Sequence, residues 1–166
     1  MRKILLLFLL IPAFFKISGQ DIKPLSWSYS IKECSEQKFV LSIHAIIAPH
    51  WYIYAENMPD GGPLPMIIRF DETTDAIPGE PLRADKTSKS MYDDVFGMNV
   101  NYYEDTALFV RKFIPPGNKF EALLYTETQA CYKKDGQCIL IVEETLLQFE
   151  KLDGHWQISA IKIINQ

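Results

Sequence analysis

Two cysteines are the residues of this sequence best suited to chemistry. Cys131 and Cys138 enclose six residues, among them Asp135-Gly136, a pair that favours a tight turn, so the chain can double back and bring both thiols together. A bridge closing so short a loop stabilises a fold by about 2–3 kcal/mol, against about 5 kcal/mol for a loop of about 100 residues. Local structural bridges are nevertheless common in exported proteins. The spacing alone leaves a structural and a redox-active bridge open, and it favours the structural one.

A metal site is a third interpretation of the same cysteines. Thiolate ligands are normally joined by further Cys or His side chains close by, and the loop between Cys131 and Cys138 contains none. The sequence therefore predicts neither a metal nor another cofactor. The remaining cysteine, Cys34, lies in the polar stretch Lys32–Glu36, which indicates a turn. We expect Cys34 to be a bystander or a site of intermolecular pairing.

Other catalytic groups form no recognisable pattern. His44, His50 and His155 are scattered and have no acid or nucleophile at a telling spacing, so each is expected to be a packing or surface residue. The sequence contains no nucleophile elbow of a serine hydrolase, no phosphate-binding loop and no His-Glu-Xaa-Xaa-His pattern. Hydrolytic and nucleotide chemistry are therefore not indicated.

The charge balance limits the class of partner. Seventeen basic and twenty-one acidic side chains give a formal charge of -4, and no run of Lys or Arg stands out. Binding to nucleic acid or to an anionic membrane surface therefore has no electrostatic support. We expect the partners to be proteins or small molecules.

The N-terminus has the composition of a secretory signal peptide. The charged pair Arg2-Lys3 precedes an apolar run from Ile4 to Phe15, and small residues follow. A spanning helix needs about 20 apolar residues, whereas this run is shorter and contains Pro12. We therefore predict a signal peptide over residues 1–19, a single domain over residues 20–166 without a membrane span in the mature chain, and a location outside the cytoplasm.

Alternation of apolar and polar residues predicts strands along the rest of the chain. Leu25 to Ile31 alternates without a slip, and Phe39 to Ile47 places every second residue on one apolar face. Further aliphatic and aromatic segments predict strands at Met66–Phe70, Thr106–Ile114, Phe120–Thr128, Ile139–Phe149 and Trp156–Ile164. Asp71 to Met91 is the least patterned stretch and is expected to be a long surface connection. Short strands separated by Gly and Pro turns, with no helical period, predict an all-β fold, an immunoglobulin-like antiparallel β-sandwich.

Three blocks of sequence, taken in order, resemble a known family. They are Pro49–Tyr54, then Tyr92–Gly97 with Tyr102-Tyr103 soon after, and finally Ala130-Cys131 to Cys138. From about residue 26 to residue 149 the chain is similar to the N-terminal periplasmic domain of the thiol:disulfide interchange protein DsbD, also called the disulfide bond corrector domain. The ordered set is more specific than any single block.

The resemblance implies a function and a site. In the family, an immunoglobulin-like domain receives electrons at a cysteine pair from a thioredoxin-like domain, and passes them to envelope disulfide isomerases or to reductases of cytochrome c biogenesis. By motif, Cys131 and Cys138 would be this redox pair, in the periplasm. The partners would be thioredoxin-fold envelope proteins and a separate membrane electron donor. The resemblance also implies a cap loop and aromatic walls, formed by Asp93, Asp94, Val95, Phe96 and Gly97 and by Tyr52 and Tyr54, respectively.

The chain departs from the family pattern at three places. The loop between the cysteines holds six residues where relatives often hold five, Ile139-Leu140 follows Cys138 where Pro is common, and Val95 occupies a cap position that is often aromatic. The alternative function is therefore a non-catalytic exported β-sandwich that binds a protein or ligand and keeps the bridge between the cysteines for stability.

Overall fold

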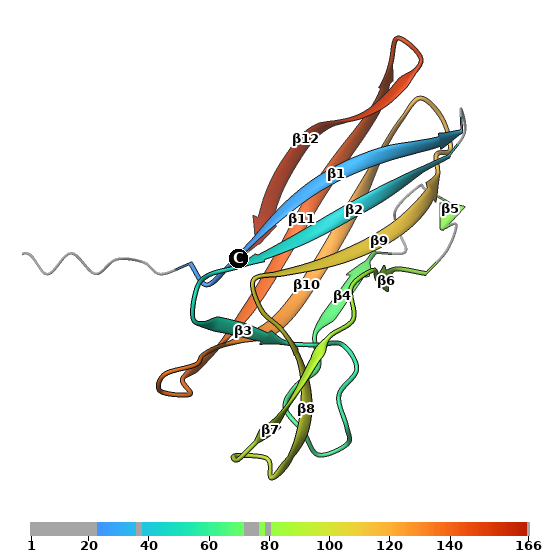
Figure 1. Cartoon of the computed structure of the whole chain (residues 1–166). Helices are drawn as coiled ribbons and strands as arrows, with labels where there is room; N and C mark the ends of the chain where they lie inside the picture. The colour runs from blue at the N-terminus through green and yellow to red at the C-terminus, as the bar shows by residue number, and fades with distance from the viewer. Residues whose placement is uncertain (1–22, 36–37, 72–76, 79–80, 166) are drawn as a thin grey trace, which may run out of the picture.

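The computed structural model describes residues 23–35, 38–71, 77–78 and 81–165, and every regular element in these ranges is a strand (Figure 1). In chain order the strands are β1 (Leu25–Ser35), β2 (Lys38–Ile47), β3 (Trp51–Tyr54), β4 (Ile67–Phe70), β5 (Ile77–Pro78), β6 (Arg83–Ala84), β7 (Lys89–Asp93), β8 (Met98–Tyr103), β9 (Thr106–Ile114), β10 (Lys119–Tyr132), β11 (Cys138–Leu152) and β12 (His155–Asn165). Within the described ranges, no helix is long and apolar enough to cross a membrane. The predicted signal peptide lies outside these ranges.

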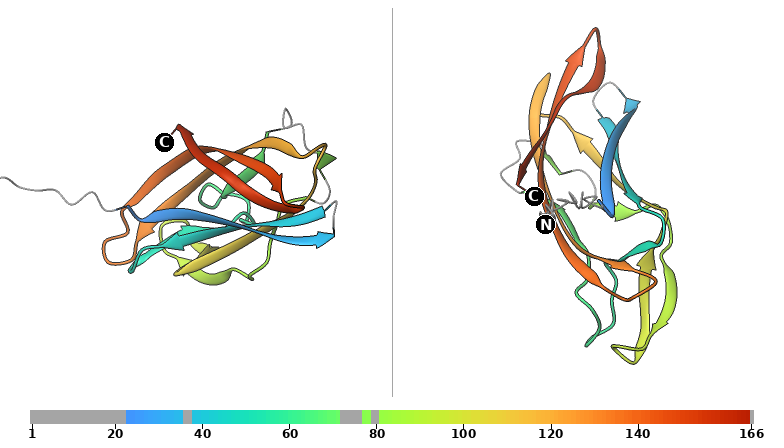
Figure 2. Two further views of the ribbon diagram at one scale, coloured as in Figure 1. Left: turned by 90° about the horizontal axis from the view of Figure 1, so that it is seen from above. Right: turned by 90° about the vertical axis from the view of Figure 1, so that its left-hand side faces the viewer.

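The strands form two antiparallel sheets that pack face to face (Figure 2). One sheet has the order β1-β2-β9-β5, with β6 also paired to β9, and the other has the order β12-β11-β10-β3-β8-β7, with β4 also paired to β10. The two layers confirm the predicted antiparallel β-sandwich. The hairpin of β7 and β8 extends beyond the end of the sandwich, on the side where β10 turns into β11 (Figure 1).

Aromatic rings fill the space between the sheets. The ring of Phe39 lies 5.7 Å from that of Phe113, 5.3 Å from that of Phe149 and 5.6 Å from that of Trp156, so both sheets contribute to one cluster. The alternation predicted for residues 39–47 is confirmed by burial of the side chains of Phe39, Leu41, Ile43, Ala45 and Ile47. Each large side chain buried in this way contributes about 1.5–3 kcal/mol of hydrophobic stabilisation.

The structure corrects two expectations about local elements. Cys34 does not lie in a turn, because β1 continues through Ser35 and Glu33 pairs with Phe39. The Glu33 carboxylate accepts a hydrogen bond from the backbone of Trp156 on the opposite sheet, which fixes this end of β1. Residues 71–91 were expected to be only a surface connection, yet β5 and β6 pair with β9 there and β7 begins. Pairing with a distant strand, rather than a local pattern, orders these short segments.

A charge placed in the core tests the packing. Ile43 is fully buried in β2, so Ile43→Asp would bury a carboxylate without a partner and should lower the free energy of unfolding by at least about 4 kcal/mol. Urea unfolding followed by far-ultraviolet circular dichroism, which should show a β-rich spectrum, measures the loss. Ser28→Asp, at an exposed position of β1, is the control and should change stability by less than about 0.5 kcal/mol. Equal losses in both variants would contradict the core assignment.

Candidate functional site

The two cysteines are joined across a strand hairpin. Cys131 near the end of β10 lies directly opposite Cys138 at the start of β11, with 4.0 Å between their Cα atoms and a disulfide of 2.06 Å between their sulfurs. Such a close approach is typical of antiparallel pairs that exchange no backbone hydrogen bonds with each other. The thiols that the sequence brings together are therefore held in contact by the sheet itself.

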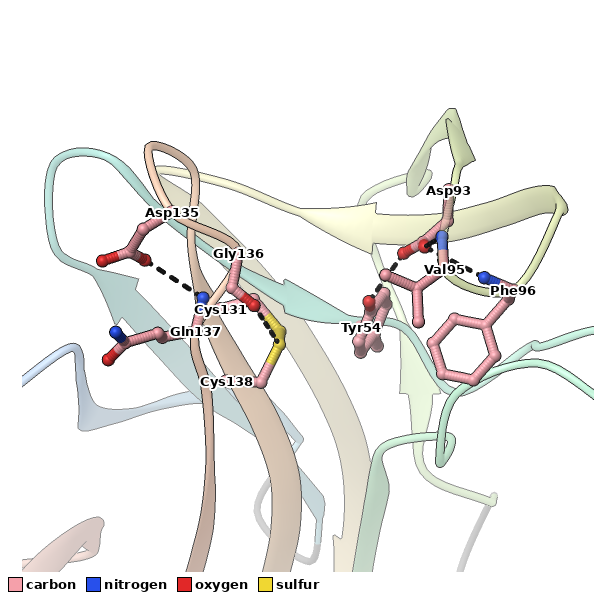
Figure 3. Close-up of a disulfide and its surroundings, with 9 residues drawn as sticks. All are labelled: Tyr54, Asp93, Val95, Phe96, Cys131, Asp135, Gly136, Gln137 and Cys138. Carbon is pink, nitrogen blue, oxygen red and sulfur yellow. Dashed lines mark hydrogen bonds between the residues drawn. A yellow bond between two sulfur atoms is a disulfide. The ribbon is translucent and has the colours of Figure 1, made fainter.

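The residues between the cysteines form a tight loop (Figure 3). The Tyr132 amide donates to the Gln137 carbonyl at 2.9 Å, and the Gly136 amide donates to the Tyr132 carbonyl at 2.9 Å. The Asp135 carboxylate accepts from the Gln137 amide at 3.0 Å, which closes a side-chain turn. Gly136 has a φ of 72°, a conformation that glycine adopts without steric cost. The Asp-Gly signal in the sequence is thus the reason why the chain reverses here.

The two sulfur-bearing residues have different environments. Cys131 is fully buried and packs with Tyr52, Tyr54 and Val100 in a small apolar cluster separate from the main core. Cys138 is exposed and lines an open hollow in the surface. A reagent or partner in solvent therefore meets Cys138 before Cys131.

The hollow has a volume of about 610 Å³ and lies between two hairpins. One hairpin is formed by β10 and β11 and carries the disulfide, and the other is formed by β7 and β8. The walls are aromatic, because the Tyr52 ring meets the rings of Tyr54 and Tyr102 edge-on at 5.5 Å and 5.7 Å. The structure thus brings Tyr52, Tyr54, Cys138 and four of the five predicted cap residues, Asp93, Asp94, Val95 and Phe96, to the lining of one hollow.

The turn between β7 and β8 is organised by one carboxylate. Asp93, the last residue of β7, is nearly buried, and its Oδ1 accepts from the amides of Val95 at 2.9 Å and Phe96 at 3.3 Å. The Asp93 carbonyl also accepts from the amide of Gly97, which has a φ of 65°. These bonds hold the side chain of Val95 in solvent, 88% exposed, and leave that of Phe96 37% exposed.

A buried tyrosine ties this turn to the body of the sheet. The Tyr54 hydroxyl on β3 donates to Asp93 Oδ2 at 2.8 Å, so both oxygens of the carboxylate are used. Burial, together with the neighbouring Tyr52 and Asp93, holds the pKa of Tyr54 well above its ordinary value, so the hydroxyl stays protonated and remains a donor. In Figure 3 the side chain of Tyr54 lies between the disulfide and the turn that carries Val95 and Phe96.

A second link between the hairpins was missed by sequence reasoning. The Glu104 carboxylate, which is partly buried, binds the ammonium of Lys89 on β7 and that of Lys133 in the loop between the cysteines. One acidic side chain thus connects the base of one hairpin to the tip of the other. No local pattern marks Glu104, because the two lysines are distant in sequence and meet only through the fold.

The three histidines do not line the hollow. His44 contacts Ser30, and His155 contacts Glu33, in agreement with the packing or surface roles predicted for them. His50 has a φ of 70°, and its carbonyl accepts from the Lys133 amide at 2.8 Å, so it supports the loop through its backbone. In the part of the chain that the structure describes, no group of three or more His, Cys, Asp or Glu residues is placed to hold a metal ion.

Comparison with known proteins places the chain in a family. The family model described as "Thiol:disulfide interchange protein DsbD, N-terminal" matches residues 24–150, which include both cysteines and the β7–β8 turn. No curated protein matches the chain in sequence.

Two solved structures share the fold. The reduced N-terminal domain of DsbD from Neisseria meningitidis has a TM-score of 0.51 at 12% identity, and the match covers 85% of this chain and 90% of that one. The N-terminal periplasmic domain of ScsB from Proteus mirabilis has a TM-score of 0.52 at 13% identity, and the match covers 75% of this chain but only 46% of that one. Identities this low establish the likeness of fold alone.

Removal of one hydroxyl tests how the β7–β8 turn is held. Tyr54→Phe leaves the nearly buried Asp93 carboxylate without one donor and should lower the free energy of unfolding by about 1–3 kcal/mol. Hydrogen exchange at the amides of Val95 and Phe96 should become faster. Tyr92→Phe, which removes an exposed hydroxyl from the same hairpin, is the control and should change neither quantity appreciably. If both variants behave alike, the Tyr54–Asp93 bond does not hold the turn.

Proposed function

Because this chain belongs to the family of DsbD N-terminal domains, we propose that it is a thiol-disulfide exchange module of the bacterial envelope. In this proposal Cys131 and Cys138 pass electrons between thioredoxin-fold partners. The observation that carries it is the asymmetry of the bridge, with one sulfur-bearing residue fully buried and the other lining an open hollow. A staple needs no access from solvent, whereas exchange requires it.

The exposure of Cys138 supports one order of the exchange steps. A thiolate of a reduced partner attacks Cys138 Sγ, the bond between the two sulfurs breaks, and its electron pair leaves on Cys131 Sγ, which takes up a proton. The second thiol of the partner, once deprotonated, attacks the partner's own sulfur in the mixed disulfide and releases Cys138 as a thiolate. The bridge has then gained two electrons and the partner's dithiol has become a disulfide. The reverse sequence passes the electrons on.

The surroundings supply the remaining roles in this proposal. Asp93, Asp94, Val95, Phe96 and Gly97 form the cap, and Tyr52 and Tyr54 form the walls. A turn with exposed apolar side chains at the rim of the hollow supports the cap, because such a turn can cover the bridge or yield to a partner. A membrane electron donor would supply the electrons, and envelope isomerases or reductases of cytochrome c biogenesis would receive them.

The proposed location is the periplasm. Residues 1–19 would be removed as a signal peptide, and residues 20–166 would form the mature domain. The charged and then apolar start of the sequence supports this, as does membership of a family whose named relatives include a periplasmic domain. A disulfide that persists in the folded chain also suits an oxidising compartment.

A second candidate function is a binding module in which the bridge is only structural. The complete burial of Cys131 and the position of the bridge between two paired strands favour it. The reduction potential separates the two candidates, because structural bridges of secreted proteins lie below about -300 mV and exchangeable ones are more oxidising. Equilibration with glutathione and dithiothreitol buffers measures it.

Single cysteine variants test the exchange steps. Cys131→Ser leaves the thiol of the exposed Cys138 and should trap a mixed disulfide with a thioredoxin-fold envelope protein. Cys138→Ser leaves the buried Cys131 at the site and should trap far less, which makes it the matched control. Both variants also carry Cys34→Ser, because Cys34 is a free and exposed thiol. Non-reducing electrophoresis and mass spectrometry identify the products. If neither variant captures such a partner and the wild-type bridge resists reduction by thioredoxin-like proteins, the binding module is the correct function.

Truncation of one ring tests the cap. Phe96→Ala should speed reduction of the bridge by dithiothreitol, because the ring no longer covers the hollow when the turn closes. Stability should change by less than about 1 kcal/mol, since the side chain is 37% exposed and leaves little core packing behind. Leu64→Ala, an exposed apolar residue that does not line the hollow, is the control. Equal reduction rates in the wild type, Phe96→Ala and Leu64→Ala would show that Phe96 does not shield the bridge.

A further inference from the structure

The strand that begins at Cys138 is paired on one side only over its first residues. β12 pairs with β11 from Glu144 to Leu152, so its contact ends before the disulfide is reached. Residues 138–143 pair with β10 on their other side. Among the described residues, no strand lies along the outer side of this segment, which is therefore an open sheet edge that begins at the exposed cysteine.

The register shows which backbone groups face this edge. The Tyr132 amide donates to the Gln137 carbonyl, and the next pair, Cys131 and Cys138, has the close Cα approach of a pair without backbone hydrogen bonds between its members. Backbone groups alternate in direction along a strand. The N–H and C=O groups of Cys138, Leu140 and Val142 therefore face away from β10, toward the open edge.

The side chains of the edge are unusually apolar for an exposed strand. Ile139 is 44% exposed and Leu140 is 54% exposed, on opposite faces of the sheet. Open edges are normally protected by Lys, Pro or a bulge. The segment Ile139-Leu140-Ile141-Val142 has no such residue, and no bulge interrupts its pairing with β10. These are the properties of an edge that accepts another strand.

We propose that this edge docks an extended segment of the thioredoxin-fold partner, next to the partner's reactive cysteine, as an added strand beside β11. The inference rests on the proposed exchange function and adds how the partner is held while the sulfurs react. The open edge starts at Cys138, which is also the residue that an attacking thiol must approach. The chain next to that thiol is therefore brought to the edge, and this makes a segment of the partner the occupant.

The geometry of an added strand suits the mixed disulfide. Because the backbone groups of Cys138 face the edge, a residue opposite it on the added strand would form a hydrogen-bonded pair with it. Such pairs have about 5.5 Å between Cα atoms, with both side chains on the same face. That separation lies within the range of about 4.4–6.8 Å that a disulfide spans. A reactive cysteine at the end of the docked segment, opposite Cys138, is thus placed for exchange with Cys138 without further movement.

Removal of one backbone donor tests the docking. Leu140→Pro removes the outward N–H of residue 140, and proline is tolerated at edge positions whose N–H faces solvent. The matched control, Leu140→Ala, keeps the N–H and removes the apolar side chain. The probe is reduced thioredoxin whose resolving cysteine is replaced by serine, so that the mixed disulfide accumulates. We expect Leu140→Pro to react about tenfold more slowly than Leu140→Ala, and both to react equally with dithiothreitol.

A second measurement keeps the inference testable if Leu140→Pro does not fold. In the wild-type mixed disulfide with the same thioredoxin, the amides of Leu140 and Val142 should become protected from hydrogen exchange. The amides of Ile139 and Ile141, which already bond to β10, serve as internal controls and should change little.

The outcomes separate this inference from the function on which it rests. If the wild-type bridge reacts with dithiothreitol but not with thioredoxin, the exchange function fails and the docking proposal fails with it. If the wild type reacts with thioredoxin while Leu140→Pro matches Leu140→Ala, or while the two outward amides exchange freely in the complex, exchange stands and edge docking is overturned. Pairing of this edge with a second copy of the chain, seen as a dimer of the free protein, would also overturn it.

Discussion

The antiparallel register that sets Cys131 opposite Cys138 is the constraint on which the rest of the site depends. A slip of one residue would move every side chain of β11 to the other face of the sheet and separate the two sulfurs. The register is fixed at one end by the Asp135-Gly136 turn. Along its length it is fixed by burial, because Ala122, Leu124 and Leu147 must face the core for the sandwich to close. The packing of the fold therefore places the disulfide.

Two carboxylates hold the β7–β8 hairpin in place beside the disulfide hairpin. Strand β8 pairs with β3 through only two residues, Tyr102 and Tyr103, so the sheet alone holds the projecting hairpin weakly. Asp93 binds the turn and receives the Tyr54 hydroxyl, while Glu104 binds lysines from both hairpins. The Tyr54–Asp93 bond is buried and is little affected by salt, whereas the Lys89 and Lys133 ammonium groups are in contact with solvent and their ion pairs are screened. The hairpin is thus held firmly at its tip and more loosely at its base.

The sequence was informative where a local rule decides the structure. Alternation located β1 and β2, and a dipeptide located the turn between the cysteines. The order of three motifs pointed to a family that the comparisons then established. Prediction was wrong for Cys34 because the continuation of β1 depends on pairing with β2 and on the contact of Glu33 with Trp156, which is distant in sequence. Glu104 was missed for the same reason, since its two lysines belong to different hairpins. The unequal exposure of the two cysteines also had no local signal.

That inequality follows from the neighbours of the two strands. At the level of the disulfide β10 is an interior strand, because Cys131 pairs with Tyr52 of β3 on one side and faces β11 on the other. β11 is an edge strand at the same level, because the pairing of β12 ends at Asn165 opposite Glu144. The interior residue is covered by its neighbours and the edge residue is open to solvent. The extent of the pairing between β11 and β12 thus accounts for the different exposure of the two cysteines. It also leaves Leu140, next but one to Cys138, on an open edge with its backbone N–H facing away from β10.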